Sequence, residues 1–184
     1  MLFCKKDFSL RPMQAGDLET VLKWRNLEHI RANMYTDQII TPEEHSKWFS
    51  DVLSRKDAEY YIFEYKEKAI GQSNVINIDH RNSKCHWGFY LGEYKIPRGS
   101  GAVMEYLTLA HIFEKKRIRK ICCEVFSFNK STVKLHRRFG FEEEGCLQKH
   151  ILKKKKYENV IRMALFEEKW KVIKERMESK LFNE

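Results

Sequence analysis

The 184-residue chain has 42% hydrophobic and 33% charged residues and only 3 prolines, which excludes a disordered or low-complexity chain and predicts one domain over residues 1–184. A formal net charge of +9 suits either a nucleic acid or an anionic small molecule as partner. No apolar run reaches the roughly 18 residues of a membrane span, and residues 1–7 do not resemble a signal peptide, so we expect a cytoplasmic protein without a membrane partner.

The first elements place an arginine where an apolar residue is expected. Residues 8–12 alternate like a short strand, and the helix that follows has an inward stripe of Leu18, Val21, Leu22 and Arg25. The guanidinium of Arg25 either snorkels to solvent or pairs with a carboxylate, or it binds an anion from a helix end.

A second helix begins at Thr41, because Pro42 suits the first helical position and Glu44 completes a capping box. One face of this helix carries His45 together with Trp48, Phe49 and Val52. On such a face a histidine is either a hydrogen-bonded core residue or a site residue.

Three strands follow as a meander over residues 60–65, 69–78 and 85–91. Potential metal ligands lie around its last turn, namely His80, Cys85 and His86. Their spacing fits no usual zinc pattern, and adjacent strand residues point to opposite faces, so we expect no metal site.

A glycine-rich loop, Ile96–Ala102, joins the meander to an amphipathic helix. Gly99 and Gly101 allow a sharp turn that aims backbone N–H groups at one point, and the helix adds its positive dipole end, which together suit phosphate. A nucleoside-triphosphate loop is excluded because no lysine follows Gly101, and a dinucleotide fingerprint is excluded because Met104 stands where a third glycine is required. An ordinary turn is the alternative.

The remaining elements are a buried strand over residues 120–126, a short helix from Asn129 to Gly140, two strands over residues 145–152 and 160–166, and an amphipathic helix over residues 166–184. The lysine run 153–156 separates the last two strands and predicts a solvated hairpin tip. The final helix covers either the core or a partner subunit, which leaves a homodimer open. This order of elements predicts a mixed α/β fold in which helices cover a central sheet.

These motifs resemble the GNAT superfamily of N-acetyltransferases over roughly residues 8 to 166. The resemblance rests on the strand Trp87–Leu91, the loop Arg98–Ala102, and the helix that runs from Asn129 to Phe139-Gly140-Phe141. It implies a GNAT-like acyl-CoA N-acyltransferase fold, with a mixed, mostly antiparallel sheet of about six to seven strands flanked by helices.

The resemblance also implies acetyl-coenzyme A as the acetyl donor. The cofactor-binding residues that it implies are Leu91, Arg98, Gly99, Ser100, Gly101, Ala102 and Asn129. The glycine loop takes the pyrophosphate, and Asn129 contacts the cofactor arm. Ile96 departs from the pattern, because the family usually has glutamine or arginine at this place.

A narrower resemblance lies in the amino-terminal half, in Trp24–Asn26, Asn33–Tyr35, Ile40, Glu44-His45 and Trp48-Phe49. These residues are similar to the acetyltransferases of pseudaminic acid biosynthesis, the sugar of flagellin glycosylation, which acetylate the 4-amino group of a UDP-linked 4-amino-4,6-dideoxy sugar. The resemblance implies that Arg25 meets nucleotide phosphate, that Met34, Tyr35 and Trp48 wall the pocket, that His45 reaches the nucleotide, and that Tyr90 touches the sugar.

N-acetyl transfer needs a neutral amine beside the thioester carbonyl and an acid for the departing thiolate. The resemblance places His136 where the family often has a tyrosine acid. A model imidazolium, with pKa near about 6.5, is a stronger acid than a thiol near about 8.5, but at neutral pH it needs a carboxylate or a water relay to stay protonated. The alternative is a packed histidine, with the thiolate protonated by solvent.

Glu124 is the candidate that relays the amine's proton through water, because strand alternation places it on the opposite sheet face from Cys123 and Val125. A structural, ion-paired glutamate is the alternative for this residue.

Two other functions stay open. Related GNAT enzymes that acetylate ribosomal protein amino termini share parts of this layout, so a peptide amine is an alternative acceptor. The second of these functions is a basic module that binds nucleic acid or senses acyl-CoA without catalysis. Against nucleic-acid binding, the lysine run lacks the interleaved aromatic residues of a stacking platform. The sequence therefore favours a small-molecule UDP-amino-sugar over a nucleic-acid partner.

Overall fold

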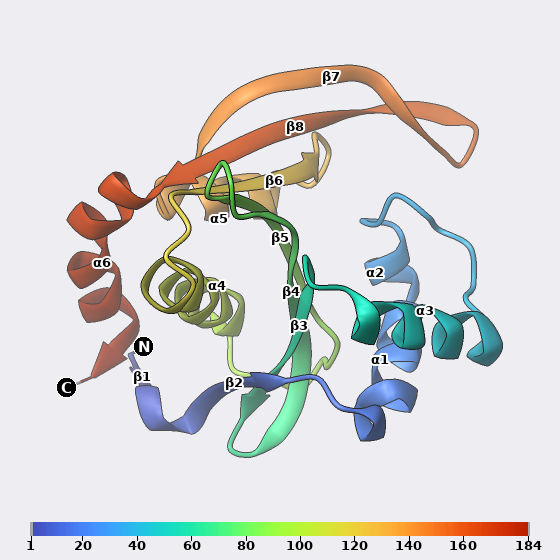
Figure 1. Ribbon diagram of the computed structural model, residues 1–184, viewed down its shortest axis with the longest axis horizontal. Coiled ribbons are helices and arrows are strands. Elements are labelled where there is room, and N and C mark those ends of the chain that lie inside the picture. The colour runs from blue at the N-terminus through green and yellow to red at the C-terminus, as the bar shows by residue number, and fades with distance from the viewer. Residues whose placement is uncertain (1, 184) are drawn as a thin grey trace.

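A seven-stranded sheet divides the structure, a computed structural model that describes residues 2–183, into two helical layers (Figure 1). The strands run in the order β2-β3-β4-β5-β6-β8-β7, with bounds β2 (Phe8–Pro12), β3 (Glu59–Tyr65), β4 (Lys68–Asp79), β5 (Lys84–Leu91), β6 (Lys120–Phe126), β7 (Glu142–Lys153) and β8 (Lys156–Phe166). Neighbouring strands are antiparallel except β5 and β6, which are parallel. The predicted mixed, mostly antiparallel sheet flanked by helices is confirmed.

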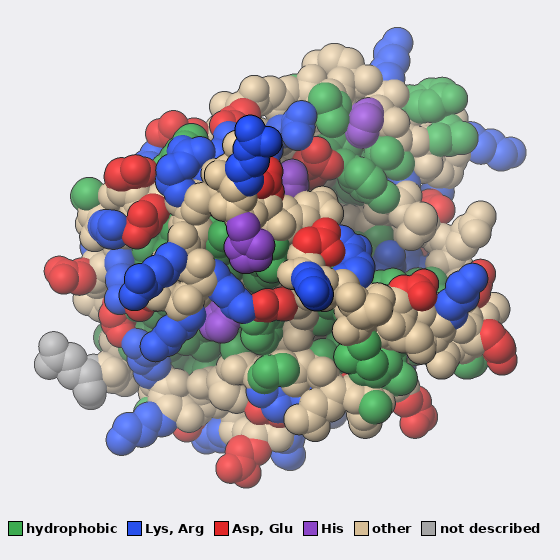
Figure 2. All heavy atoms as spheres, viewed as in Figure 1, with side chains coloured by type: hydrophobic (Ala, Val, Ile, Leu, Met, Phe, Trp, Pro, Cys, Tyr) green, Lys and Arg blue, Asp and Glu red, His purple; other side chains and the backbone are tan. Residues whose placement is uncertain are grey.

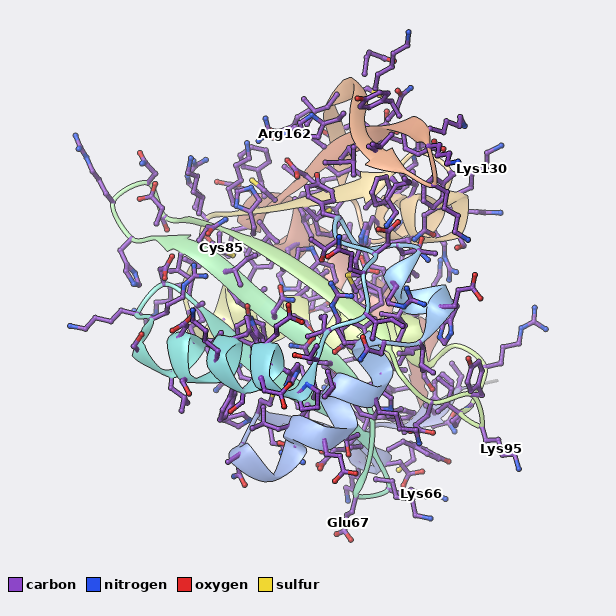
Figure 3. The ribbon with its side chains drawn as sticks, turned by 90° about the vertical axis from the view of Figure 1, so that its right-hand side faces the viewer. Lys66, Glu67, Cys85, Lys95, Lys130 and Arg162 are labelled. Atoms are coloured by element: carbon purple, nitrogen blue, oxygen red, sulfur yellow. The ribbon has the colours of Figure 1, made fainter. Side chains whose placement is uncertain are left out.

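Helices cover both faces of this sheet (Figure 1). One layer holds α1 (Leu18–Arg25), α2 (Glu28–Arg31) and α3 (Pro42–Ser54), and the other holds α4 (Ser100–Ala110), α5 (Lys130–Arg138) and α6 (Glu167–Leu181). Strand alternation separates two cores, because Ile62 packs with Val21 and Trp24 of the first layer while Phe63 packs in the larger core with α4. The view in Figure 3 shows α1 and α3 side by side on their face of the sheet.

Local sequence signals explain where several helices begin. The side chain of Thr41 accepts a hydrogen bond from the backbone of Glu44, and the Glu44 carboxylate accepts one from the backbone of Thr41, which completes the predicted capping box of α3. Helix α2 was not predicted, because four residues are too few to show a helical period.

Short elements complete the chain: 3-10 turns at Lys5–Asp7 and Ala15–Asp17, a π-helical turn at His111–Lys115, and the parallel pair β1 (Phe3–Cys4) and β9 (Phe182–Asn183), which brings both ends of the described chain together (Figure 1). The last helix, α6, covers the core, which is one of the two alternatives that the sequence left open. Trp170 of α6 is 1% exposed and packs on the rings of Tyr106 and Phe113.

The strands β5 and β6 separate partway along their length. They pair only from Lys84 opposite Lys120 to His86 opposite Cys122. Beyond this point β5 stays paired with β4 and β6 stays paired with β8, so the two halves of the sheet diverge and leave backbone groups of β5 and β6 facing a gap.

The surface carries mixed charge on the face that Figure 2 shows, where Lys and Arg side chains alternate with Asp and Glu. This face is hollowed beneath the β7–β8 hairpin (Figure 2). Within residues 2–183, none of the helices combines the length and the apolar character that crossing a membrane requires.

Candidate active site

A cavity of about 310 Å³ fills the gap between β5 and β6, and we call it the strand pocket. Its walls are residues 87–91 of β5 and 123–126 of β6, and Asn129, Thr132 and His136 close it from the side of α5. Unpaired strand edges offer N–H and C=O groups to an extended ligand. The pocket therefore suits a long, amide-containing chain such as the pantetheine arm of coenzyme A.

The glycine loop ends beside this pocket at the amino terminus of α4. Gly99 has φ of 105°, a left-handed conformation that explains why glycine is needed there. The N–H of Ser100 donates to the carbonyl of Pro97 and that of Ala102 donates to Gly99. Within the described chain the amides of Gly99 and Gly101 have no backbone acceptor. Of the predicted pyrophosphate-binding loop, these two N–H groups are therefore the ones that stay available for an anion.

Other residues of the loop take different places. The Ser100 hydroxyl donates to the Pro97 carbonyl at 2.7 Å, and Ala102 is buried, so neither side chain faces a ligand. Ile96 packs against the core, which agrees with its departure from the polar residue of the family. Arg98 is exposed at the tip. Figure 3 shows Lys95 on this loop and Lys130 at the start of α5 at the same side of the molecule, where they add positive charge.

The other two predicted cofactor residues line the strand pocket, namely Leu91 and Asn129. Leu91 lies beside the loop, since a Cβ added at Gly101 would be 3.6 Å from its Cδ1. The Asn129 Oδ1 accepts a hydrogen bond from the Thr132 backbone at 3.2 Å and caps α5. Its capping role leaves only the amide nitrogen of Asn129 for a cofactor.

His136 lies at the inner wall of the strand pocket and is 3% exposed. Its Nδ1 is 2.8 Å from Oε1 of Glu105 on α4. Burial lowers the pKa of His136, but the charge of Glu105 and the hydrogen bonds of Cys123 and Glu105 together outweigh burial and raise the pKa to about 10. The sequence analysis required a carboxylate to keep His136 protonated. Glu105 supplies that carboxylate, and sequence reasoning did not identify it.

Glu124 lies on the outer wall of the same pocket. One carboxylate oxygen accepts a hydrogen bond from the hydroxyl of Tyr35, and the other is 3.2 Å from Nε of Arg162. Burial and this carboxylate raise the pKa of Tyr35. Glu124 is therefore ion-paired, which agrees with the structural alternative for this residue. It also lines the strand pocket, and its role as a proton relay stays a prediction.

A second cavity, of about 410 Å³, lies between the sheet and the first helical layer, and we call it the arginine pocket. It brings together five of the six predicted substrate residues, namely Arg25, Met34, His45, Trp48 and Tyr90. Met34 and Tyr90 also line the strand pocket, so the two cavities adjoin. Tyr35 lies elsewhere, because its ring packs 5.7 Å from that of Phe126 on β6.

Within the part of the chain that the structure describes, the lining of this pocket gives Arg25 no carboxylate as a counter-ion. Its Nη2 donates to the hydroxyl of Thr36 at 3.3 Å, whereas Nη1 is buried and has no hydrogen-bond partner within the described residues. Burial lowers the pKa of the guanidinium. A buried donor nitrogen of a cation is costly without a partner, so this arrangement favours the anion-binding interpretation of Arg25 over pairing with a carboxylate.

Aromatic side chains form the rest of the arginine pocket. His45 is 4% exposed and its ring lies 5.0 Å from that of Trp48, and Trp48 in turn meets Tyr60 edge-on. Burial, with the charge of Arg25, lowers the pKa of His45, so its imidazole is neutral at neutral pH. Burial raises the pKa of Tyr90, which keeps its hydroxyl protonated. These flat, neutral groups suit a nucleobase or a sugar ring.

Sequence reasoning missed two amides in the arginine pocket, Gln72 and Asn74 of β4. Asn74 lines both pockets and therefore stands where they meet. A signal existed, because Gln72, Ser73 and Asn74 form a polar run between the apolar residues Ile70 and Val75, and buried polar residues point to a site.

The predicted solvated lysine tip needs a correction at Lys153, which is 7% exposed. Its Nζ donates to the carbonyls of Arg31 at 3.1 Å and Met34 at 2.7 Å, and it lies 3.2 Å from the Asp37 carboxylate. The β7–β8 hairpin reaches over the segment that follows α2, so this lysine is buried against backbone carbonyls, whereas Lys154 pairs with Glu28 at the surface. Lys153 thereby fixes the segment that carries Met34.

We expect Lys153→Met to raise the KM for the acceptor several-fold with little change in kcat, because methionine keeps the length but cannot hold the segment of Met34 and Thr36. Charge-assisted hydrogen bonds contribute about 1.5–3 kcal/mol, so the melting temperature should fall as well. Steady-state kinetics and thermal unfolding measure both effects. Lys154→Met is the matched control, since Lys154 is 78% exposed, and equal effects of the two variants would contradict the assignment.

Comparisons with known proteins agree with this geometry. The family model described as acetyltransferase (GNAT) domain matches residues 7–142. The chain is 26% identical over 128 residues to YokL, an uncharacterized SPbeta prophage-derived N-acetyltransferase of Bacillus subtilis, covering 68% of this chain and 71% of the relative. It is 24% identical over 129 residues to the acetyltransferase PseH of Campylobacter jejuni, covering 70% and 79%.

A solved structure shares the fold. The spermidine N-acetyltransferase from Vibrio cholerae, in complex with CoA and spermine, matches with a TM-score of 0.85 at 19% identity, over 90% of this chain and 98% of the solved one. Within the described residues, no group of three or more His, Cys, Asp or Glu side chains is arranged to hold a metal ion.

Proposed function

The chain belongs to the GNAT acetyltransferase family and is an acetyl-CoA-dependent N-acetyltransferase, and we propose that it acetylates the 4-amino group of a UDP-linked 4-amino-4,6-dideoxy sugar in the cytoplasm. The acceptor follows from the similarity of the amino-terminal half to the acetyltransferases of pseudaminic acid biosynthesis. The observation that carries it is Nη1 of Arg25, which is buried and has no hydrogen-bond partner within the described residues, in a pocket that adjoins the strand pocket.

The charge of the arginine pocket favours an anionic acceptor over a polyamine. Among the described residues, its lining holds Arg25 and the neutral His45 but no aspartate or glutamate. A polyamine needs carboxylates beside its ammonium groups, whereas a diphosphate offers Nη1 of Arg25 the anion that it lacks. The spermidine N-acetyltransferase therefore supports the fold and the transfer chemistry but not a polyamine acceptor.

The two pockets give each substrate a place. The amides of Gly99 and Gly101 fit the pyrophosphate of acetyl-CoA, and the free edges of β5 and β6 fit its pantetheine arm. When bound, acetyl-CoA supplies an activated acetyl thioester. Asn74 and Tyr90 stand where the pockets meet and would orient the amine. His136 would protonate the leaving sulfur, and Glu124 would take up the amine's proton through water.

Thiol release tests the acceptor. With acetyl-CoA and a UDP-linked 4-amino sugar, we expect the purified protein to release thiol and to add one acetyl group to the sugar, seen by mass spectrometry. Spermidine and a peptide with a free amino terminus are the competing acceptors. Acetylation of the peptide with no acetylation of the sugar would establish an amino-terminal acetyltransferase instead. Acetylation of spermidine alone would establish a polyamine acceptor.

The non-catalytic alternative makes the opposite prediction. A basic nucleic-acid-binding module would release no thiol with any amine, and its binding to DNA or RNA would weaken steeply as salt is added.

A further inference from the structure

The carboxylate of Glu105 is buried against the strand pocket. Glu105 is 0% exposed and is the one charged residue of α4, an eleven-residue helix whose other side chains are apolar, small or hydroxylated. Its Oε1 lies 2.8 Å from Nδ1 of His136, and its Oε2 is buried with no hydrogen-bond partner within the described chain. A buried carboxylate costs free energy unless an opposite charge compensates it, so packing alone does not explain a glutamate here.

Aromatic rings and two ionisable side chains surround the imidazole of His136. The rings of Trp87 and Phe141 lie 5.4 Å and 5.0 Å from the imidazole. The ionisable groups that act on the pair are the Cys123 thiol from β6 and the Arg138 guanidinium from α5. Glu105 occupies Nδ1, and the Cys123 side chain also forms a hydrogen bond with His136. Nε2 is therefore the nitrogen that remains on the side of the strand pocket, which Cys123 and His136 both line.

We propose that Glu105 is a positioning residue for His136, whose carboxylate holds the Nδ1 proton so that Nε2 keeps its own proton and points into the strand pocket. The inference rests on N-acetyl transfer and on the predicted acid role of His136. It does not depend on which amine is the acceptor.

The transfer step balances with this assignment. As the C–N bond forms and the C–S bond breaks, the thiolate takes the Nε2 proton of His136. Glu124 takes up the proton that the new amide loses, through water, and a proton then returns through water to His136 and restores the imidazolium. The Glu105 carboxylate compensates the positive charge of His136 each time that charge returns.

Pairing with Glu105 makes His136 a weaker acid but keeps a larger fraction of it protonated at neutral pH. Burial raises the pKa of Glu105 and would lower that of His136, but the charge of Glu105, together with the hydrogen bonds of Cys123 and Glu105, raises the pKa of His136 to about 10. The imidazolium is thus present at neutral pH and is lost only as the pH rises through about 10. A histidine with an ordinary pKa of about 6.5 would be a stronger acid but mostly uncharged at pH 8.

Titration of His136 by NMR, with histidine labelled in the ring, tests the inference without any substrate. In the wild type we expect His136 to stay protonated through pH 9. Glu105→Gln keeps the shape and a hydrogen-bond acceptor but removes the charge, so the pKa of His136 should fall to about 6.5 or below. A wild-type His136 that titrates near 6.5, or a titration that Glu105→Gln does not move, would overturn the proposal. The titration of wild-type His136 is measured on the wild-type protein, so this part of the test does not depend on whether Glu105→Gln folds.

Kinetics then separate positioning from structure. Relative to the wild type at the same pH, kcat of Glu105→Gln should be about 30-fold lower at pH 8 and nearly equal at pH 5.5, since a group with pKa about 6.5 is about 3% protonated at pH 8. The KM for acetyl-CoA should not change. An equal loss at both pH values would show a merely structural role.

Two further variants complete the test. Glu105→Gln added to His136→Ala should cause no further loss, because Glu105 acts through His136. Glu114→Gln is the matched control, as Glu114 follows the same helix but pairs with Lys174 at the surface, and it should leave the His136 titration unchanged. If the nucleotide sugar is not accepted but the titration shifts as expected, the acceptor proposal fails and the role of Glu105 stands.

Discussion

Replacing His136 by alanine is expected to lower kcat by about 10²- to 10⁴-fold, the range over which a positioned general acid contributes. His136 lines the strand pocket and its Nδ1 is bound by Glu105, so removing the imidazole removes the charged donor at this wall. The KM for acetyl-CoA should change little, because the glycine loop and strand edges would still hold the cofactor. Thiol release under saturating substrates measures the loss.

His136→Gln distinguishes chemistry from packing. Glutamine fills most of the space and keeps hydrogen-bonding groups near Glu105, but it cannot act as an acid at neutral pH. We expect its kcat to fall as far as that of the alanine variant. A glutamine variant with the wild-type rate across pH would support the alternative of a packed histidine, with solvent protonating the thiolate. His80→Ala, in the exposed turn after β4, is the control.

Replacing Arg25 by alanine is expected to raise the KM for the nucleotide sugar by about 10- to 100-fold, since a charge-assisted hydrogen bond is worth about 1.5–3 kcal/mol and each 1.4 kcal/mol is tenfold. An amino sugar without the nucleotide lacks the phosphate, so its KM should not change. The difference between the two acceptors, measured under the same conditions, is the result that matters. Equal effects on both would indicate a structural arginine.

The same variant should not lose stability. Because Nη1 of Arg25 is buried without a partner within the described residues, removing the guanidinium also removes an uncompensated cost, and we expect an unchanged or higher melting temperature. Arg55→Ala is the comparison, since Arg55 is an exposed arginine paired with Asp57 and outside both pockets. A large fall in melting temperature for Arg25→Ala alone would argue that its charge is satisfied in the folded protein.

Much of the fold was predictable because it follows from short-range interactions. The capping box of Thr41 and Glu44 starts α3 where the sequence predicts it, and β6 has the predicted bounds of residues 120–126. The left-handed turn at Gly99 was predictable for the same reason, since the conformation depends on the residue's own backbone. Helix α2 was missed, as its four residues carry no period.

The candidate site was predictable in part. Motif resemblance brought Arg25, His45 and Trp48 together before the arginine pocket was known, and each side chain lies in it. It did not locate Tyr35, whose hydroxyl instead donates to Glu124 across 89 positions of sequence. The amide of Asn74 was overlooked because a strand pattern alone does not say which face meets a cavity.

The sequence by itself therefore determined the order of the sheet strands and of the helices other than α2, the glycine turn before α4 and the candidate acid His136. Only the tertiary structure decided that Glu105, 31 positions away, sits at Nδ1 of that histidine. It also decided that Lys153 is bound to backbone carbonyls 122 and 119 positions away, while Arg25 keeps a free Nη1. Periodicity and turns depend on neighbours in the chain, whereas the partner of a buried charge depends on which distant elements the sheet brings beside it.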